Sequence, residues 1–168
     1  QITEFKNKLD KINNFKNIVI LDKITDTGNI GNILRSCVMF NIDAVIFEKR
    51  IFKQDSLNMI KNASGAVDVI DIITTSNILN TIKILKNKNF WVTSIDINGT
   101  QVLNEYKWSD KNVIIFGSEQ KGIGNLLLKN SDYKVSINTK KNKHIDSLNV
   151  SNVASITLSH LFNFVWGF

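Results

Sequence analysis

Residues 113–124 read VIIFGSEQKGIG, an apolar run followed by a segment that contains Gly117, Gly122 and Gly124. The β-branched and aromatic side chains of the run favour a buried strand, and the glycines indicate a loop of special backbone conformation before the next helix. Gly117 and Gly122 have the spacing of a phosphate-binding loop, but Ile123 stands where such a loop requires lysine. The segment therefore predicts a strand that leads into a ligand-binding loop, and it argues against a nucleoside triphosphate as the ligand.

Short apolar runs alternate with helical patterns over the rest of the chain in the same way. Strands this apolar, separated by helices, favour a mostly parallel sheet with helices on both faces, so the expected fold class is α/β. In such sheets ligands bind beyond the carboxyl ends of the strands. The expected strands are residues 17–21, 44–47, 69–73, 90–95, 113–116 and 134–137, and the expected helices lie near residues 30–40, 55–62, 76–88, 123–130 and 148–164.

The organisation of the chain is expected to be simple. Residues 1–16 carry apolar side chains at helical spacing and predict a short N-terminal helix or a linker. Residues 17–168 are enough for one domain that buries its own core without disulfides. The chain starts at Gln1, and one interpretation is that an upstream substrate-binding domain is missing.

The charge of the chain is compatible with a nucleic-acid partner. A formal net charge of +6 and an isoelectric point near 9.4 suit a polyanion, but a general preference for Lys, Asn and Ile gives the same excess without any ligand. No stretch approaches the roughly 20 apolar residues of a membrane span, and no secretory signal opens the chain. The single cysteine, Cys37, has no partner for an internal disulfide and falls within a predicted helix, where a core role is expected. A cytoplasmic protein without membrane contact is expected.

A second glycine loop lies in residues 21–37, LDKITDTGNIGNILRSC, where a strand leads into a helix that is expected to begin near Asn29 or Ile30. Asn29 at the start of this helix offers an amide or caps the first turn, and Arg35 lies about two turns further along. Only Arg35 and Arg50 among the 21 basic residues are arginines, which indicates that Arg35 makes a planar, bidentate contact that lysine cannot make. In the structural alternative, the glycines merely turn the chain and Arg35 is solvated.

The third loop lies in residues 137–156, INTKKNKHIDSLNVSNVASI, in which Ser147 is expected to cap the last helix. Lys140, Lys141 and Lys143 place positive charge beside the start of that helix, where a nucleic-acid backbone can dock. The alternative is a solvated loop in a lysine-rich protein.

Two further interpretations concern the remaining chemical groups. Glu119 is the only acid in the 113–124 segment, and it is either a functional carboxylate or an exposed residue favoured by the nearby helix dipole. His144 and His160 have no second His, Cys or acid at metal-ligand spacing, so both are expected to be structural or surface residues and no metal site is expected.

In order and spacing, the three loops resemble the three motifs of the SpoU/TrmH family of RNA 2′-O-ribose methyltransferases, which belongs to the SPOUT superfamily. The resemblance spans residues 17–164, and NASGA at residues 62–66 is similar to a further recurrent stretch of the family. The third motif, Ser-Leu-Asn-Val-Ser, is matched in full at residues 147–151. The positions that match the first two motifs are Asp26, Gly28, Asn29, Gly31 and Arg35, and then Gly117, Glu119 and Gly122.

The resemblance implies a deep trefoil knot at the C-terminal end of the sheet, with the methyl donor S-adenosylmethionine (AdoMet) bound in the knot. It also implies a homodimer whose active site draws on both subunits. The residues that it assigns to the cofactor are Gly117, Ile137, Leu148, Ser94, Ile95 and Gly122.

The resemblance assigns the chemistry to Arg35, Asn29, Glu119, Ser147 and Asn149. The family proposal makes the arginine the base, but a guanidinium with a pKa above about 12 is a poor base at neutral pH. We therefore expect Arg35 to bind a phosphate or ribose oxygen and to stabilise the developing alkoxide.

The implied substrate is RNA, and the run in residues 21–36 is nearer to the branch that methylates a guanosine of large-subunit (23S) ribosomal RNA than to the tRNA wobble enzymes. Transfer RNA remains the first alternative, and a non-catalytic RNA-binding module on the same fold is the second. The sequence departs from the family pattern at Thr27, Asn138 and Thr139, and the last two positions bear on cofactor affinity.

Overall fold

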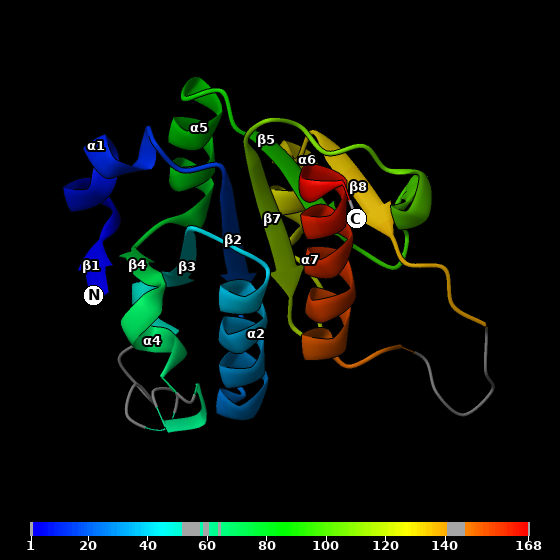
Figure 1. Ribbon diagram of the computed structural model, residues 1–168, viewed down its shortest axis with the longest axis horizontal. Coiled ribbons are helices and arrows are strands. Elements are labelled where there is room, and N and C mark those ends of the chain that lie inside the picture. The colour runs from blue at the N-terminus through cyan, green and yellow to red at the C-terminus, as the bar shows by residue number, and fades with distance from the viewer. Residues whose placement is uncertain (1, 52–57, 59–60, 64, 141–146, 168) are drawn as a thin grey trace.

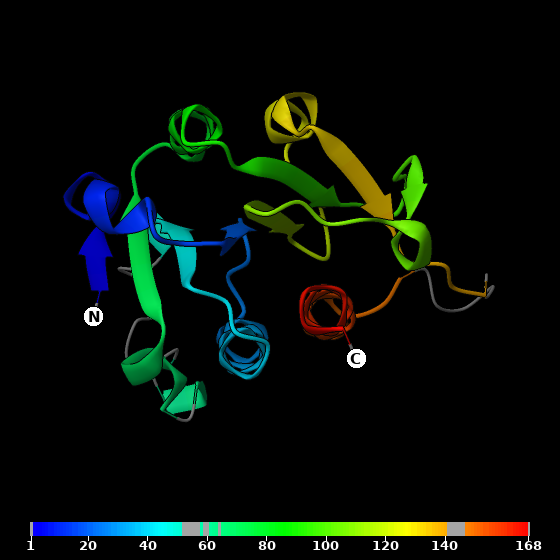
Figure 2. The ribbon, with the colours of Figure 1, turned by 45° about the horizontal axis from the view of Figure 1, so that its top comes forward.

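The computed structural model describes residues 2–51, 58, 61–63, 65–140 and 147–167. These residues form one sheet of eight strands, in the order β1-β4-β3-β2-β7-β5-β8-β6, and every pair of neighbouring strands is parallel. Helices cover both faces of the sheet (Figures 1 and 2). The expected α/β class with a mostly parallel sheet is therefore confirmed, while the knot stays a prediction of the resemblance.

The elements have the following bounds. The strands are β1 Ile2–Glu4, β2 Asn17–Asp22, β3 Ala44–Glu48, β4 Asp71–Thr75, β5 Trp91–Ile95, β6 Gln101–Val102, β7 Asn112–Gly117 and β8 Tyr133–Ser136. The helices are α1 Leu9–Ile12, α2 Thr27–Met39, α4 Ala66–Val69, α5 Ile78–Asn87, α6 Asn125–Asn130 and α7 Val150–Trp166, with short 3-10 helices at Phe5–Lys8 and Leu103–Glu105.

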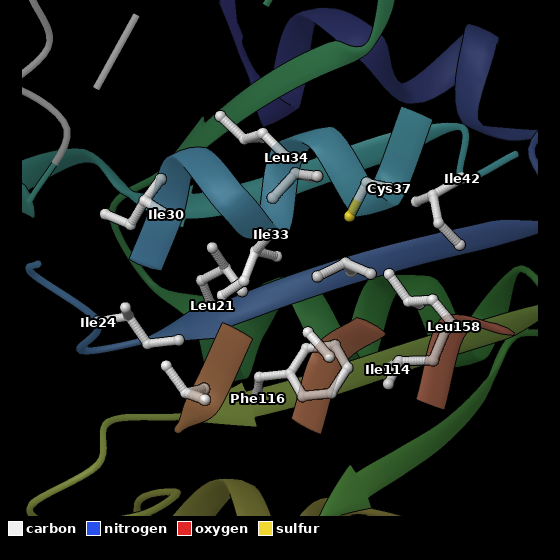
Figure 3. Close-up of a cluster of buried hydrophobic side chains, with 14 of the residues drawn as sticks. Leu21, Ile24, Ile30, Ile33, Leu34, Cys37, Ile42, Ile114, Phe116 and Leu158 are labelled. Atoms are coloured by element: carbon white, nitrogen blue, oxygen red, sulfur yellow. The ribbon is translucent and has the colours of Figure 1, made fainter. Parts of the chain in front are cut away.

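The sheet separates the core into two layers, as the side chains of the central strand β2 show. Its side chains alternate, so that Val19 and Leu21 join the layer under α2 and α7, whereas Ile18 and Ile20 join the layer under α5. Figure 3 shows the first layer between α2, β2 and α7. Cys37 lies in this layer with no exposed surface, and burial raises the pKa of its thiol well above the usual range.

Some sequence predictions need correction. The prediction of a helix or linker for residues 1–16 is wrong for Ile2–Glu4, which forms an edge strand beside β4 because its backbone pairs in register with residues 72–74. The strand expected at residues 69–73 begins at Asp71, since Val69 ends α4 and is 72% exposed. The two-residue strand β6 was not predicted, because no apolar run marks it in the sequence. Most of the helix expected near residues 55–62 falls outside the described residues.

All the strands of a parallel sheet end at one edge, and this edge positions the loops that the sequence singled out. Figure 1 shows the arrowheads of β2 and β7 pointing to the edge at which α2 and α7 begin. Within the described part of the chain, no helix is long and apolar enough to cross a membrane.

The pH dependence of folding should report on a contact between α7 and the chain before β7. Trp108 is buried, and its indole Nε1 donates to Nδ1 of His160 at 3.0 Å. Burial lowers the pKa of His160, so the unfolded chain takes up the proton first as the pH falls. Neutral His160 thus contributes to the stability of the fold at pH values above its unfolded pKa of about 6.5. This contribution is lost as the pH falls from there through the lower pKa of the folded protein.

We expect the melting temperature to fall between about pH 7 and 5, and the fall to be smaller in His160→Asn, whose side-chain oxygen accepts from Trp108 without titrating. The measurement is thermal unfolding of both proteins over this range. His144, outside the described residues, is present in both and cancels in the comparison. Equal pH profiles would contradict the prediction.

Candidate functional site

A cavity of about 340 Å³ lies at the carboxyl ends of β5, β7 and β8. Its walls come from the chain after β5 (residues 95–98), the chain from the end of β7 (residues 116–123), the residues after β8, and the start of α7. Five of the six residues assigned to the cofactor line it, namely Ile95, Gly117, Gly122, Ile137 and Leu148. The cavity therefore joins segments that lie far apart in the sequence.

Ser94, the sixth of these residues, does not line the cavity. Its side chain is fully buried, and its Oγ lies 2.5 Å from Oγ of Ser131 at the end of α6. Because successive side chains of a strand point to opposite faces, Ile95 reaches the cavity and Ser94 does not. The geometry gives Ser94 a role in holding α6 against β5.

The loop after β7 needs glycine because two backbone segments meet there. A Cβ on Gly117 would lie 2.3 Å from the carbonyl carbon of Gly122 and 2.3 Å from the amide nitrogen of Ile123. Gly122 has a φ of 61°, and its N–H donates to the carbonyl oxygen of Ser118 at 2.8 Å. The loop thus folds back on the end of β7 and presents backbone to the cavity.

The cavity wall is mostly apolar with a few charged groups. Phe116, Ile123 and Val150 are buried side chains that form part of it, whereas Leu148 is 38% exposed. The charged lining residues are Asp96, Glu119 and Lys121. Such a surface suits a ligand with a flat apolar part and polar substituents.

Asn149 joins three of the sequence motifs through its side chain. Its Nδ2 donates to Oδ1 of Asn29 at 2.9 Å and to Oε1 of Glu119 at 2.6 Å. The same Glu119 oxygen accepts from the backbone N–H of Val150 at 3.2 Å. Oδ1 of Asn149 accepts from the N–H of Ser151 at 2.9 Å and caps α7.

The expected cap of the last helix is corrected by this geometry. Ser147 stands two residues too early, lies exposed and lines the cavity, whereas Asn149 occupies the cap position. Both residue types cap helices well, so the sequence alone did not decide between them. Asn29, Glu119, Ser147 and Asn149 are all brought to one region.

Replacing Asn149 tests whether this junction stabilises the fold. Asn149→Ala removes the cap and leaves Glu119 without its side-chain donor, so we expect a loss of about 1–2 kcal/mol of unfolding free energy. Asn149→Asp keeps an oxygen for the cap but places two carboxylates together, and it should also weaken the junction. The measurement is urea unfolding, with the exposed neighbour Asn152→Ala as the matched control. Equal stabilities of Asn149→Ala and the control would count against the junction.

The start of α2 is also earlier than expected. The helix begins at Thr27, and its cap is Asp26, whose Oδ1 accepts from the N–H of Asn29 at 2.7 Å. Asn29 is therefore free of the capping role and directs its side chain to Asn149. Thr27, one of the positions that depart from the pattern of the family that the sequence resembles, accepts from Nδ2 of Asn62 at 3.2 Å.

Arg35 lies apart from this cluster. It is exposed in the third turn of α2, lines none of the cavities described, and makes no ion pair with the described residues. Lys140 is exposed in the segment after β8. Lys141 and Lys143 lie outside the described residues. In this part of the chain, no three His, Cys, Asp or Glu side chains are grouped as a metal site.

A second cavity, of about 290 Å³, adjoins the first and was not anticipated from the sequence. It is lined by residues 23–26 after β2, by Asn29, and by the loop after β7. Ser118, Glu119, Lys121 and Val150 line both cavities and form their common wall. The sequence analysis also did not single out Lys23 or Asp96 as site residues. Each is the first residue after a strand, and ligands of parallel sheets bind beyond the ends of the strands, so this position could have identified them.

Fold and cavities together define an α/β domain with two adjoining cavities that are built by loops at the carboxyl edge of a parallel sheet. The sequence pattern of the SpoU rRNA Methylase family matches residues 16–159. The chain belongs to this family.

Comparison with individual proteins agrees with the family assignment. A protein of Borreliella burgdorferi named as an uncharacterized tRNA/rRNA methyltransferase is 40% identical over 154 residues, which cover 90% of this chain and 66% of that protein. A relative from Mycoplasma pneumoniae with a similar name is 32% identical over 84% of this chain and 58% of its own length. The chain thus spans less than two thirds of the length of these relatives.

A solved structure shares the fold at low sequence identity. The SpoU methyltransferase AviRb from Streptomyces viridochromogenes, crystallised in complex with AdoMet, has a TM-score of 0.78 and 19% identity over 87% of this chain and 56% of its own. At this identity the likeness bears on the fold alone.

Proposed function

We propose that this chain transfers a methyl group from AdoMet to a ribose 2′-hydroxyl in RNA. The observation that carries the proposal is the cavity of about 340 Å³ beside the Asn29–Asn149–Glu119 junction, because a cavity of this size lies next to polar groups drawn from all three motifs. Membership of the family supports the same chemistry. The AdoMet complex of AviRb, which has the same fold, supports the choice of cofactor.

The residues of the cavity fit this cofactor. Its volume lies in the range of about 300–1,000 Å³ that small-ligand sites occupy. Gly117, Ile137 and Leu148 would hold the adenine between backbone and apolar side chains, and Asp96 offers a carboxylate to the polar parts of the cofactor. When bound, AdoMet supplies an electrophilic sulfonium methyl group.

The polar junction orients the acceptor. Glu119 uses one carboxylate oxygen to hold Asn149 and the start of α7, and its second oxygen has no protein donor among the described residues. Ser147 adds a hydroxyl at the mouth of the cofactor cavity. Fixed donors and acceptors of this kind align the ribose hydroxyl for in-line attack, and aligned geometry supplies much of the rate.

Arg35 would act as an electrostatic stabiliser. Its guanidinium remains protonated at neutral pH and can hold a phosphate or ribose oxygen through two parallel hydrogen bonds. Since Arg35 lines neither cavity of its own chain, we propose that it serves the site of a partner subunit in a homodimer. Exposed apolar side chains at the ends of α2 and α7, Met39, Phe164 and Trp166, offer surface for such a partner.

The proposed substrate is a guanosine of large-subunit ribosomal RNA, in the cytoplasm. Transfer RNA is the first alternative, and the names of the relatives cover both kinds of RNA. The second alternative, an RNA-binding module without catalysis, rests on the departures from the family pattern at Asn138 and Thr139, of which Thr139 lines the cavity. Lys140, Lys141 and Lys143 are proposed to contact the RNA backbone.

Two measurements test the proposal. Calorimetry should detect AdoMet binding to this chain, and label from the AdoMet methyl group should appear in unmodified 23S ribosomal RNA transcript as a ribose 2′-O-methyl group. Label in tRNA transcripts instead would select the first alternative. RNA binding without AdoMet binding would select the non-catalytic module and reject the proposal.

A further inference from the structure

Two lysines from different loops line the second cavity. Lys23 comes from the loop after β2, and Lys121 comes from the loop after β7. Neither forms an ion pair or a side-chain hydrogen bond with the residues that the structure describes. In contrast, Lys8, Lys11 and Lys86 are paired with Asp71 or Asp132.

The acids of the second cavity are already engaged with protein donors. Oδ1 of Asp26 accepts from the N–H of Asn29 at 2.7 Å. Oε1 of Glu119 accepts from Asn149 at 2.6 Å and from the N–H of Val150 at 3.2 Å. Both acids keep their charge, but their hydrogen bonds hold them on protein donors, whereas the two lysines have no such partner among the described residues. Their ammonium groups are therefore free to donate to an anionic group such as a phosphate.

The backbone directs Lys23 to this place at a conformational cost. Its φ is 57°, in the left-handed region, where the other non-glycine residues of the described chain are Asn41 and Asn89. The neighbouring Asp22 is buried and accepts from the N–H of Gly124 at 2.8 Å, which ties the end of β2 to the loop after β7. Nζ of Lys23 lies 3.5 Å from the position that a Cβ of Gly124 would take. Uncommon backbone conformations of this kind cluster at functional sites, so the position of Lys23 beside the cavity supports a functional role for its side chain.

The common wall of the two cavities places the two lysines close to the proposed site of methyl transfer. Glu119 and Lys121 line both cavities, so a nucleotide in the second cavity lies next to a ligand in the first. Resting on the function proposed above, we propose that Lys23 and Lys121 hold the phosphate beside the ribose that is methylated. They are positioning residues that fix the acceptor nucleotide against the common wall.

Lys23 gives the sharper test, because Lys121 also lines the cofactor cavity. We expect Lys23→Gln to raise the KM for RNA about tenfold, with kcat at saturating RNA and the Kd for AdoMet unchanged. The dependence of RNA affinity on salt between about 50 and 200 mM should become shallower by about 0.7–0.9 in logarithmic slope, which corresponds to one lost phosphate contact. The probe is unmodified 23S ribosomal RNA transcript, with tRNA transcript as the second probe.

Two further variants control this experiment. Lys83→Gln removes an exposed lysine on α5 that has no ion pair with the residues that the structure describes, and it should leave KM and salt slope unchanged. Lys23→Asn tolerates the left-handed backbone, so it should weaken RNA binding like Lys23→Gln without lowering the melting temperature.

An unchanged KM and salt slope in Lys23→Gln would overturn the inference, as would an equal loss in Lys83→Gln. A loss of AdoMet affinity in Lys23→Gln would place Lys23 at the cofactor instead. Failure of the wild-type chain to bind AdoMet rejects the proposed function separately. The salt dependence of RNA affinity still tests Lys23 in that case, because it is measured by binding and does not require methyl transfer.

Discussion

Arg35→Lys is expected to lower the rate of RNA methylation by about 100- to 1,000-fold although the charge is conserved. An ammonium group cannot reproduce the two parallel donors of a guanidinium, so the contact to a phosphate or ribose oxygen would be lost. Arg35 lies outside the cofactor cavity, and AdoMet affinity should therefore be unchanged. The measurements are single-turnover methylation of unmodified RNA and calorimetric AdoMet binding.

The second arginine of the chain is the matched control. Arg50 is exposed, and its ion pair with Glu48 spans 3.4 Å, so Arg50→Lys should retain wild-type activity. Wild-type methylation by Arg35→Lys would reject both the base and the stabiliser role. If Arg35 serves the partner's site, mixing Arg35→Lys with Asn149→Ala should restore some activity, because mixed dimers contain one site with both native residues.

Gly117→Ala is expected to abolish measurable AdoMet binding, a loss of at least about 100-fold in affinity. The added methyl would meet the backbone of Gly122 and Ile123 at 2.3 Å, and backbone cannot move aside as a flexible side chain can. The loop after β7 must then shift away from the strand, which changes the wall of both cavities. Overpacking of this kind costs about 1–3 kcal/mol of stability.

Gly124→Ala is the control in the same loop. Its added methyl would approach only the ends of two side chains, Oδ2 of Asp22 at 3.4 Å and Nζ of Lys23 at 3.5 Å. We expect near wild-type AdoMet affinity for this variant. AdoMet affinity in Gly117→Ala equal to that of Gly124→Ala would show that the close approach does not shape the cofactor site.

The three loops could be located from the sequence because each combines an apolar strand with residues that need special backbone. Gly117 and Gly122 are informative for this reason, since the structure gives one a close backbone approach and the other a positive φ. The capping residues of the helices were harder to predict from the sequence. Asp26 and Asn149 replaced Asn29 and Ser147 as caps, because several good capping residues stand within three positions of each helix start.

The sequence alone determined the α/β class, the burial of β2 and β7, and the family to which the three motifs point. These follow from local composition and spacing, which persist whatever the rest of the chain does. It could not reveal that Asn29 and Asn149, 120 residues apart, share a hydrogen bond, nor that Ser94 points away from the cavity.

Only the tertiary structure decided where the motif residues meet. Parallel strands that are not neighbours in sequence end at one edge, and their register places Asp22 beside Gly117 and so fixes the loops against one another. This arrangement also separated Arg35 from the cavities and brought Lys23 and Lys121 to the wall of one cavity. Residues that are far apart in the sequence come together only when their strands pair. The pattern of residues along the chain does not show which strands pair, so it could not give these distances.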